Sequence, residues 1–322
     1  MDPQQTRSLI ERYLNAFNAR DFDTLVGLYA ADATIEDPVG SAPHRGLKDI
    51  RAFYEQFRTQ KSSLHRVGEV RAAGSAAAFS FIVVMGESAN SQIVEVTDTF
   101  AFDAVGKIEE MRAFWGPGNV HDVNSMSREL RRCLPLPMAG RVALVTGGGS
   151  GMGQATAVEF ARKGARVVCG PGDSGSIQNE AGAAMLRNQL IALAGANADA
   201  DRIRGVVTAY LGSLASQDIE ARAALFAPDA IFEDPVGSKP VVGLEALRSV
   251  WTASRGLKVT ASLKRLIVCG REACYEFVAD LDAGHGDRAS INCIETLKLD
   301  AKGRIVEMRA YFDRSCIGSF IP

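Results

Sequence analysis

The 322-residue chain has few of the residues that mark disulfide-rich, metal-binding or membrane proteins. Its six cysteines show no paired short spacing, so we expect reduced, buried thiols rather than a disulfide framework. The four histidines are scattered and none lies at ligand spacing from a cysteine, so no metal site is expected. No run of about 18 apolar residues is present, so no membrane span is expected either.

An excess of charge of one sign is also missing. The formal net charge is −2 and no long basic run occurs, so nothing indicates a nucleic-acid partner. Residues 1–5 lack the basic and then apolar stretch of a secretory signal, and together with the unpaired cysteines this predicts a cytoplasmic protein.

What the sequence does contain is one unit that occurs twice. Residues 36–41 read Glu-Asp-Pro-Val-Gly-Ser and recur as residues 233–238, which lie 197 positions later. Residues 110–113 and 307–310 both read Glu-Met-Arg-Ala and are the same distance apart. A constant offset requires equal internal spacing, and this one is far longer than the roughly 20–50 residues of a solenoid repeat. The chain therefore contains a duplicated domain.

Within each unit the pattern predicts helices first and strands afterwards. Apolar residues from Leu9 to Phe17 recur at three- and four-residue steps, as on an amphipathic helix, and shorter helices are expected at 24–29 and 48–57. Strands are expected at residues 77–85, 93–102 and 108–115. Helices followed by antiparallel strands predict an α+β domain.

The two units flank a segment of different character. Two prolines in Leu134-Pro135-Leu136-Pro137 indicate a linker. Beyond them, residues 141–145 and 166–169 have the composition of buried strands on either side of a glycine-rich loop and a helix. We divide the chain into a first unit at 1–120, a linker at 121–138, a strand–helix–strand segment at 139–198 and a second unit at 199–322.

Each unit carries a phenol and two carboxyl groups at matching positions. They are Tyr13, Asp37 and Asp98 in the first unit and Tyr210, Asp234 and Glu295 in the second. The other residues on the strand face of Asp98 are apolar, so desolvation should raise its pKa and keep it a neutral acid. Taken singly, Asp98 suits a strand end, Asp37 an Asx turn and Tyr13 a packed core aromatic. Together they form a base opposite two hydrogen-bond donors, which suits proton removal next to a ketone.

At these residues both units resemble the bacterial ketosteroid isomerase (steroid Δ5-isomerase) family, within the nuclear-transport-factor-2-like, or SnoaL-like, fold. The resemblance rests on Arg12-Tyr13, residues 28–40, Asp98, Gly106-Lys107-Ile108 and Met111-Arg112-Ala113, and it covers nearly all of residues 5–120. It implies two cone-shaped domains, each with three helices packed on a curved, mostly antiparallel sheet.

The resemblance also implies a cofactor-independent isomerase that moves a β,γ double bond of a steroid-like substrate into conjugation with its 3-ketone. Asp37 would carry the proton, while Tyr13 and a protonated Asp98 would hold the dienolate oxygen. Tyr29 and Tyr54 match the family's supporting tyrosines. The expected apolar walls for a small hydrophobic ketone are Phe53, Val83, Met85, Met111 and Trp115.

The second unit departs from the family at three positions. Glu295 replaces the aspartate, and Phe226 and Trp251 replace the supporting tyrosines. Loss of one oxyanion donor costs about 2.7–4 kcal/mol in other enzymes, so we expect reduced activity there, with a copy kept only for packing as the alternative. Because the family forms dimers through its sheets, we expect an intramolecular pseudo-dimer of the two units, or else a homodimer.

Residues 146–153 resemble the cofactor loop of short-chain dehydrogenases, with Gly147, Gly151 and Gly153 placed to approach a pyrophosphate. No tyrosine has a lysine four residues later, as that family requires, and Gly170-Pro171-Gly172 stands where a ribose-binding acid is expected. We expect a truncated remnant with no cofactor, although residual nucleotide binding stays open.

Three alternatives remain. One is a dehydratase or cyclase of the same fold, which would need a pocket histidine that the expected inward strand faces lack. Another is a non-catalytic binder of hydrophobic ligands. The one with least support is an NAD(P)-dependent short-chain oxidoreductase.

Overall fold

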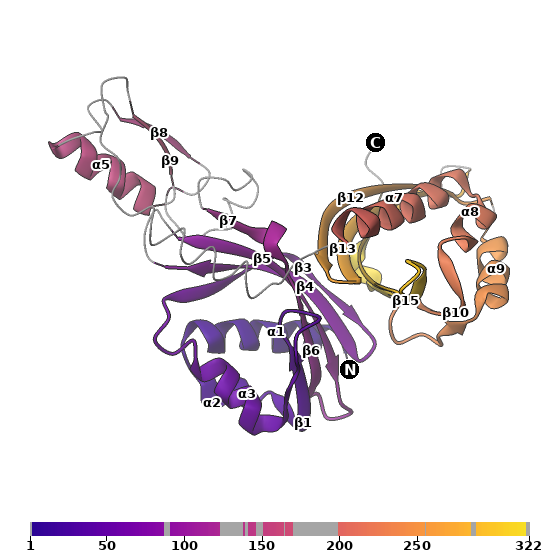
Figure 1. The fold of residues 1–322 in the computed structure, drawn as a ribbon, viewed down its shortest axis with the longest axis horizontal. Helices are drawn as coiled ribbons and strands as arrows, with labels where there is room; N and C mark the ends of the chain where they lie inside the picture. The colour runs from indigo at the N-terminus through magenta and orange to yellow at the C-terminus, as the bar shows by residue number, and fades with distance from the viewer. Residues whose placement is uncertain are drawn as a thin grey trace.

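Two α+β domains make up most of the part of the chain that the computed structural model describes (Figure 1). The described residues are 2–86, 91–122, 138, 141–145, 151–163, 165–169, 199–254, 256–284 and 288–319. The two units have the same order of helices and strands, which confirms the predicted fold class. No helix in these ranges is long and apolar enough to cross a membrane.

Three helices open the first domain: α1 (Pro3–Asn18), α2 (Phe22–Val26) and α3 (Gly46–Glu55). Helix α1 begins with a proline in its first turn, where a missing N–H costs nothing. At α2 the Asp21 side chain accepts a hydrogen bond from the backbone N–H of Thr24 at 3.0 Å. The buried face of α1 includes Ile10, Tyr13 and Phe17, so amphipathic spacing directs the Tyr13 phenol into the core.

The helices cover the concave face of a curved seven-stranded sheet (Figure 1). Its strands are β1 (Tyr29–Glu36), β2 (His44–Arg45), β3 (Ser62–Ala73), β4 (Ala76–Met85), β5 (Gln92–Phe102), β6 (Ile108–Phe114) and β7 (Val120–Asp122). They lie in the order β2-β1-β6-β5-β4-β3, with β7 paired to β5. Only β1 and β6 pair in parallel, so the sheet is mostly antiparallel, as expected.

The second domain repeats this arrangement. Its helices are α7 (Ala200–Ser216), α8 (Ile219–Ala223) and α9 (Leu244–Ala253). Its strands are β10 (Phe226–Glu233), β11 (Val241–Val242), β12 (Lys258–Cys269), β13 (Glu272–Asp282), β14 (Arg288–Leu299), β15 (Ile305–Tyr311) and β16 (Ile317–Ser319). They follow the same sheet order.

The offset of 197 residues between the copies does not hold throughout the sheets. Asp98 pairs across the strands with Phe79, whereas Glu295 pairs with Tyr275. Residues of β3 and β4 therefore correspond to residues of β12 and β13 at an offset of 196, and the longer offset returns at β5. This shift changes which side chain faces the buried acid in each domain.

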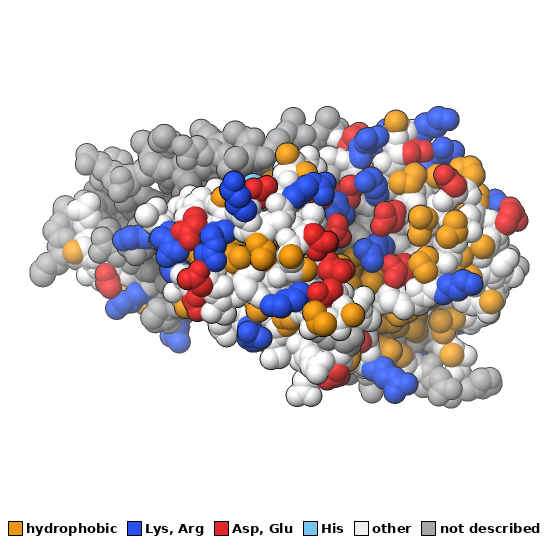
Figure 2. All heavy atoms as spheres, turned by 90° about the horizontal axis from the view of Figure 1, so that it is seen from below, with side chains coloured by type: hydrophobic (Ala, Val, Ile, Leu, Met, Phe, Trp, Pro, Cys, Tyr) orange, Lys and Arg blue, Asp and Glu red, His pale blue; other side chains and the backbone are white. Residues whose placement is uncertain are grey.

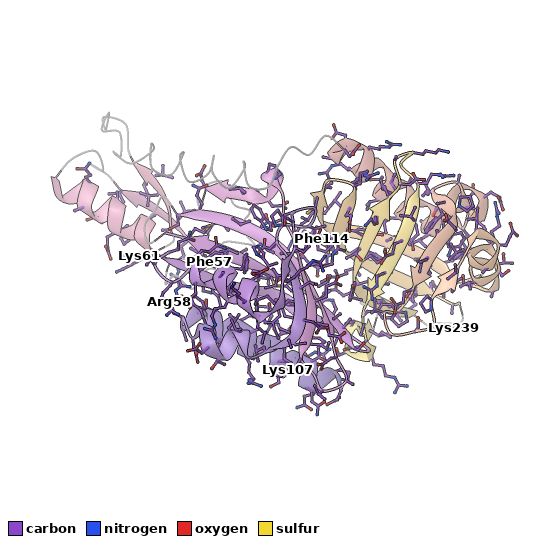
Figure 3. All side chains as sticks on the ribbon, turned by 60° about the horizontal axis from the view of Figure 1, so that its bottom comes forward. Phe57, Arg58, Lys61, Lys107, Phe114 and Lys239 are labelled. Carbon is purple, nitrogen blue, oxygen red and sulfur yellow. The ribbon has the colours of Figure 1, made fainter. Side chains whose placement is uncertain are left out.

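The two sheets pack against each other through the faces that point away from their helices. One apolar cluster spans both domains and includes Val39, Phe114, Val236 and Tyr311. Phe114 lies between the two domains in Figure 3. Polar contacts reinforce this core, because buried Arg71 donates to Glu276 of the other domain at 2.9 Å. The contact expected of a pseudo-dimer is thus made within one chain, while the oligomeric state itself stays a prediction.

The segment between the domains contains β8 (Val142–Val145), α5 (Gly151–Arg162) and β9 (Arg166–Cys169). The two strands pair in parallel, so this is a short βαβ unit, and it projects from the first domain on the side away from the second (Figure 1). Gly151 and Gly153 fall in the first turn of α5, while Gly147 lies outside the described residues. The proposed domain boundaries stay predictions.

Charges of both signs are mixed on one face of the molecule. On the face shown in Figure 2, Lys and Arg side chains lie among Asp and Glu side chains, without a broad patch of either sign. Three of the described cysteines, Cys269, Cys274 and Cys293, are free and buried.

Candidate active site

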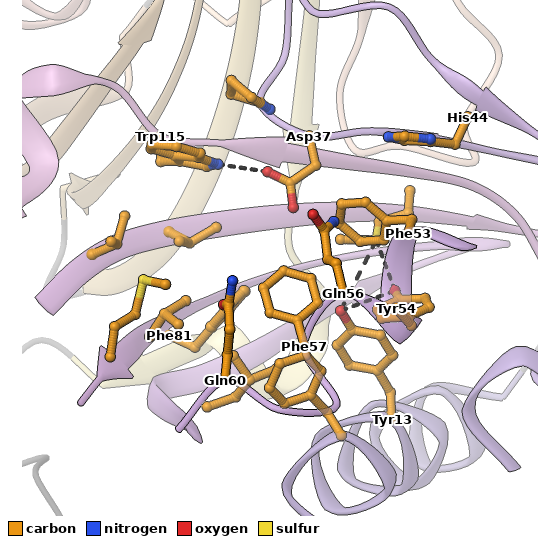
Figure 4. A pocket seen from close by; sticks show the side chains of 18 residues that line it. Tyr13, Asp37, His44, Phe53, Tyr54, Gln56, Phe57, Gln60, Phe81 and Trp115 are labelled. Atoms are coloured by element: carbon orange, nitrogen blue, oxygen red, sulfur yellow. Dashed lines mark hydrogen bonds between the residues drawn. The ribbon is translucent and has the colours of Figure 1, made fainter. Parts of the chain in front are cut away.

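The first domain encloses a cavity of about 310 Å³ between its helices and the concave face of its sheet (Figure 4). The five residues expected to form apolar walls all line it: Phe53, Val83, Met85, Met111 and Trp115. Tyr13 and Asp37 line it as well, so the structure brings the expected base and one expected oxyanion donor to a single cavity.

Asp37 follows directly after β1 and is held by the indole of Trp115. The Trp115 N–H donates to Asp37 Oδ1 at 2.6 Å, and in Figure 4 the other carboxylate oxygen points into the cavity. Burial raises the pKa of Asp37 to about 6, and the Trp115 hydrogen bond opposes that rise. A base whose pKa lies near neutrality is suited to taking and returning a proton.

The turn after Asp37 is fixed by the residue before it. Glu36 Oε1 accepts from the backbone N–H of Gly40 at 2.7 Å, and Glu36 Oε2 accepts from Arg112 Nε at 2.9 Å. The Asp37–Pro38 peptide bond is cis. The position of the carboxylate is therefore set by contacts on both sides of it.

Three tyrosines form a buried hydroxyl chain that ends at the cavity. The hydroxyls of Tyr29 and Tyr54 are 2.6 Å apart, and Tyr54 donates to the Tyr13 hydroxyl at 3.4 Å. Burial raises the pKa of each well above 10.0, so all three stay protonated donors at neutral pH. The supporting roles expected of Tyr29 and Tyr54 stay predictions, and this chain of hydroxyls is the geometry on which they rest.

Asp98 on β5 is fully buried, and neither carboxyl oxygen has a hydrogen-bond partner among the described residues. Burial, followed by the nearby charge of Asp37, raises the pKa of Asp98 well above 3.8, the direction expected of a neutral acid. One expectation is not met, because Asp98 is not among the residues that line the cavity. Its single methylene keeps the carboxyl close to the sheet, and its cross-strand neighbour Phe79 offers it no hydrogen bond.

The second domain arranges its acid differently. Glu295 is buried and accepts a hydrogen bond from the Tyr275 hydroxyl, which takes the place of Phe79. Burial raises the pKa of Glu295 to about 8, and the bond from Tyr275 opposes the rise. Burial likewise raises the pKa of Asp234 to about 6, but Phe312 occupies the position that corresponds to Trp115, so Asp234 lacks the matching indole donor.

The second domain has a smaller cavity among its helices, beside Leu214 and Trp251, which correspond to Phe17 and Tyr54 of the first domain. A cavity of about 70 Å³ lies between α7, α8, α9 and β12. Tyr210, Asp234 and Glu295 are not among its lining residues. This cavity is therefore not the counterpart of the one that Tyr13 and Asp37 line in the first domain.

Comparison with known proteins assigns both domains to one family. Residues 10–111 and 207–308 each match the family described as the SnoaL-like domain. The chain belongs to the SnoaL-like family. It is 40% identical over 116 residues to a steroid Delta-isomerase of Nocardioides simplex, a match that covers 36% of this chain and 94% of the isomerase.

Two further similarities were found. A match of 48 residues, 50% identical, covers 15% of this chain and 18% of the hydroxynaphthalene reductase arp2 of Aspergillus fumigatus. Among solved structures, the epoxide hydrolase/cyclase-like enzyme SalBIII is 24% identical with a TM-score of 0.36, over 39% of this chain and 100% of that one.

Sequence reasoning missed three polar residues that line the cavity, His44, Gln56 and Gln60, and it underestimated Trp115. His44 on β2 lines the cavity, with its ring 5.0 Å from that of Phe53, so the expectation of a pocket without histidine is wrong. The strand of two residues that carries it is too short to show a periodic pattern. Trp115 was expected only as an apolar wall, but its N–H donates to Asp37. No set of three potential metal-ligating side chains is found in the described ranges.

Proposed function

We propose that the first SnoaL-like domain is an isomerase that moves a β,γ double bond of a steroid-like ketone into conjugation with the carbonyl group. The observation that carries the proposal is the Asp37 carboxylate, half-buried at the wall of a mostly apolar cavity and bonded to Trp115. The identity with a steroid Delta-isomerase, over nearly the whole of that protein, supports it.

In the proposed reaction, Asp37 removes a proton from the carbon between the ketone and the alkene. The electron pair of that C–H bond shifts toward the ketone and forms a dienolate. Asp37 then returns the same proton to the far alkene carbon, and the conjugated enone results. The Trp115 hydrogen bond occupies one carboxylate oxygen, which leaves the other free to carry the proton between the two carbons.

The dienolate oxygen would be held by Tyr13. Because Tyr54 donates to Tyr13 and is itself bonded to Tyr29, the chain of hydroxyls can respond to negative charge on the substrate oxygen. The unpaired Asp98 carboxyl, kept neutral by burial, is the second proposed donor. A substrate oxygen that reaches the Asp98 carboxyl would accept the hydrogen bond for which the described residues offer no acceptor.

The cavity selects for an apolar substrate. Its volume of about 310 Å³ falls within the roughly 300–1,000 Å³ of small-molecule sites. The proton moves require no group beyond Asp37, Tyr13 and Asp98, so we propose a reaction without a cofactor.

The test is conversion of a Δ5-3-ketosteroid to its conjugated enone, followed by ultraviolet absorbance. We expect Asp37→Asn to lower kcat at least a hundredfold, because an amide cannot accept the proton. The matched variant Asp234→Asn should retain most of the activity. If Asp37→Asn kept full activity, the assignment of the base would be wrong.

His44 favours one second candidate, a dehydratase or cyclase of the same fold. It supplies the pocket imidazole that such chemistry needs, on the cavity wall beside Phe53. His44→Gln should leave isomerase turnover within about twofold, since no step above uses this side chain. A loss as large as that of Asp37→Asn would show that the isomerase reaction also depends on His44.

A further inference from the structure

The second domain buries an arginine where the first buries a leucine. Arg222 in α8 is 6% exposed and corresponds to Leu25 in α2, which is 0% exposed. Its guanidinium donates to Ser213 Oγ at 3.2 Å and to the Ser213 carbonyl oxygen at 3.0 Å. The same group lies 5.2 Å from the ring centroid of Trp251.

These contacts leave the charge of Arg222 without an anion. In the described part of the chain it makes no ion pair, since both its hydrogen bonds go to Ser213. A guanidinium has five N–H donors, so three are left after these two bonds. Burying a cation without a counter-charge costs free energy, and burial accordingly lowers the pKa of Arg222. Leucine fills the corresponding position of the first domain, so packing alone does not require an arginine here.

The cavity of about 70 Å³ described above lies directly against this guanidinium. Its other walls include Leu214, Trp251, Leu257 and Val259. The volume is several times the roughly 10–15 Å³ that one water requires, and about half of a cavity that holds benzene. The space therefore suits a molecule of about the size of butyrate.

Two neutral polar side chains at this cavity each make a hydrogen bond within the protein. Gln217 donates a side-chain N–H to the Leu257 carbonyl oxygen, and the Ser254 hydroxyl donates to the Trp251 carbonyl oxygen at 2.9 Å. Arg222 is the charged side chain of the cavity lining, so its unused donors are the groups that a carboxylate would bind most strongly.

We propose that this cavity binds the carboxylate of a small aliphatic acid, with Arg222 as its anchor. The planar guanidinium can hold both carboxylate oxygens, while Leu257 and Val259 contact the alkyl chain. The site lies in the second domain and does not depend on the isomerase proposed for the first.

The chain provides its own reporter for this site. It has two tryptophans, Trp115 and Trp251, so Trp115→Phe leaves Trp251 in the cavity wall as the single fluorophore. Sodium butyrate would be titrated at constant ionic strength, with sodium chloride making up the balance, and butyramide would serve as the uncharged isostere. We expect a saturable change in Trp251 emission with butyrate and at least tenfold weaker binding of butyramide.

Variants at position 222 then test the anchor. In the Trp115→Phe background, Arg222→Met should abolish saturation by butyrate, and Arg222→Lys should weaken it severalfold because an ammonium lacks the planar fork. Asp37→Asn should leave butyrate binding unchanged, which separates this result from that of the isomerase assay.

Three results would overturn the proposal. They are no saturable response to butyrate, an equal response to butyramide, and unchanged butyrate affinity in the Arg222 variants. If Arg222→Met fails to fold by circular dichroism, Arg222→Lys decides, because it keeps the charge and removes the bidentate geometry. Unchanged affinity in Arg222→Lys would then count against the anchor.

Discussion

At the scale of single residues, the proposed base is governed by two opposing influences. Burial raises the pKa of Asp37, and the Trp115 hydrogen bond lowers it, with a balance at about 6. The pKa of Asp37 is higher in the folded state than in the unfolded state, so the folded state binds the proton more tightly. The free energy of unfolding that Asp37 contributes therefore falls as pH rises from 3.8 through about 6. The carboxylate needed for catalysis forms over the same range.

This balance predicts how activity depends on pH. The kcat/KM of the wild type should rise with pH and level off above an apparent pKa near 6. Trp115→Phe removes the bond that lowers the pKa, so its profile should shift to higher pH. Isomerase assays across pH 4–9 check both, and Phe312→Trp in the second domain is the control that should leave the profile in place. An unshifted profile in Trp115→Phe would show that this bond does not tune the base.

The hydroxyl chain makes a second prediction at this scale. Tyr54→Phe removes the donor to Tyr13 and the partner of Tyr29, so kcat should fall roughly three- to tenfold, as for loss of about 1 kcal/mol. KM should change little, since Tyr13 itself stays in place. Steady-state kinetics provide the check, with Trp251→Phe at the matching position of the second domain as the control. A change in KM alone would place Tyr54 in substrate binding instead.

At the scale of elements, the strands with clear alternation could be predicted and the others could not. Strand β5 has apolar residues on both sides of Asp98 along one face, so sequence alone located the buried acid. Strand β1 has exposed residues in its middle and a register shift between Tyr29 and Thr34, so it shows no simple period. Strand β2 is only two residues long, so no periodic pattern in the sequence could predict that His44 lines the cavity.

The sequence also could not predict the hydrogen-bond partner of Glu295 in the second domain. A fixed offset of 197 residues aligns Asp98 with Glu295 but not Phe79 with Tyr275, because the intervening strands are displaced by one residue. Cross-strand pairing depends on three-dimensional register, which a repeat in the sequence does not specify. The tyrosine that bonds Glu295 was therefore visible only in the structure.

This pairing makes a prediction for the second sheet. Tyr275→Phe removes the hydrogen bond that opposes burial, so the pKa of Glu295 should rise above its value of about 8. The free energy of unfolding at pH 7 should fall by about 1–2 kcal/mol, the usual cost of losing a buried hydrogen bond. Urea denaturation measures this loss, with Phe79→Tyr in the first domain as the reverse change. A stability equal to the wild type would mean that the bond carries no net energy.

At the scale of the whole molecule, the second domain reaches the first at the residues around the proposed base. Glu272 accepts from Arg112 Nη2 at 2.8 Å, and Arg112 in turn bonds Glu36. The Cys269 thiol donates to the backbone oxygen of Trp115 at 3.3 Å. The corresponding residues of the first domain are alanines, Ala76 and Ala73, which cannot return these contacts. Around Asp37, the second domain therefore makes contacts with the first that the first domain does not make in return.

We expect Glu272→Gln to lower the kcat of the first site by about two- to tenfold, because it loosens Arg112 and the turn that holds Asp37. The ion pair of Arg309 with Glu233 in the second domain corresponds to that of Arg112 with Glu36. Arg309→Gln breaks it and should leave kcat unchanged. Isomerase kinetics of both variants, compared at equal folded fraction, provide the test. Equal effects of the two changes would indicate general loosening rather than directed support.

The contact between the two sheets described above includes a close approach of Gly74 in the first domain to Gly237 in the second, and this approach bears on how the domains differ. A Cβ atom on either glycine would lie 2.8 Å from the Cα atom of the other, so neither position tolerates a side chain. The equivalent glycines, Gly270 and Gly40, have no atom within 4 Å of such a Cβ, so this contact occurs once rather than twice. A homodimer with twofold symmetry must repeat every contact. When the two copies are joined in one chain, symmetry no longer constrains the interface. Each half of the interface can then contain contacts that the other half lacks.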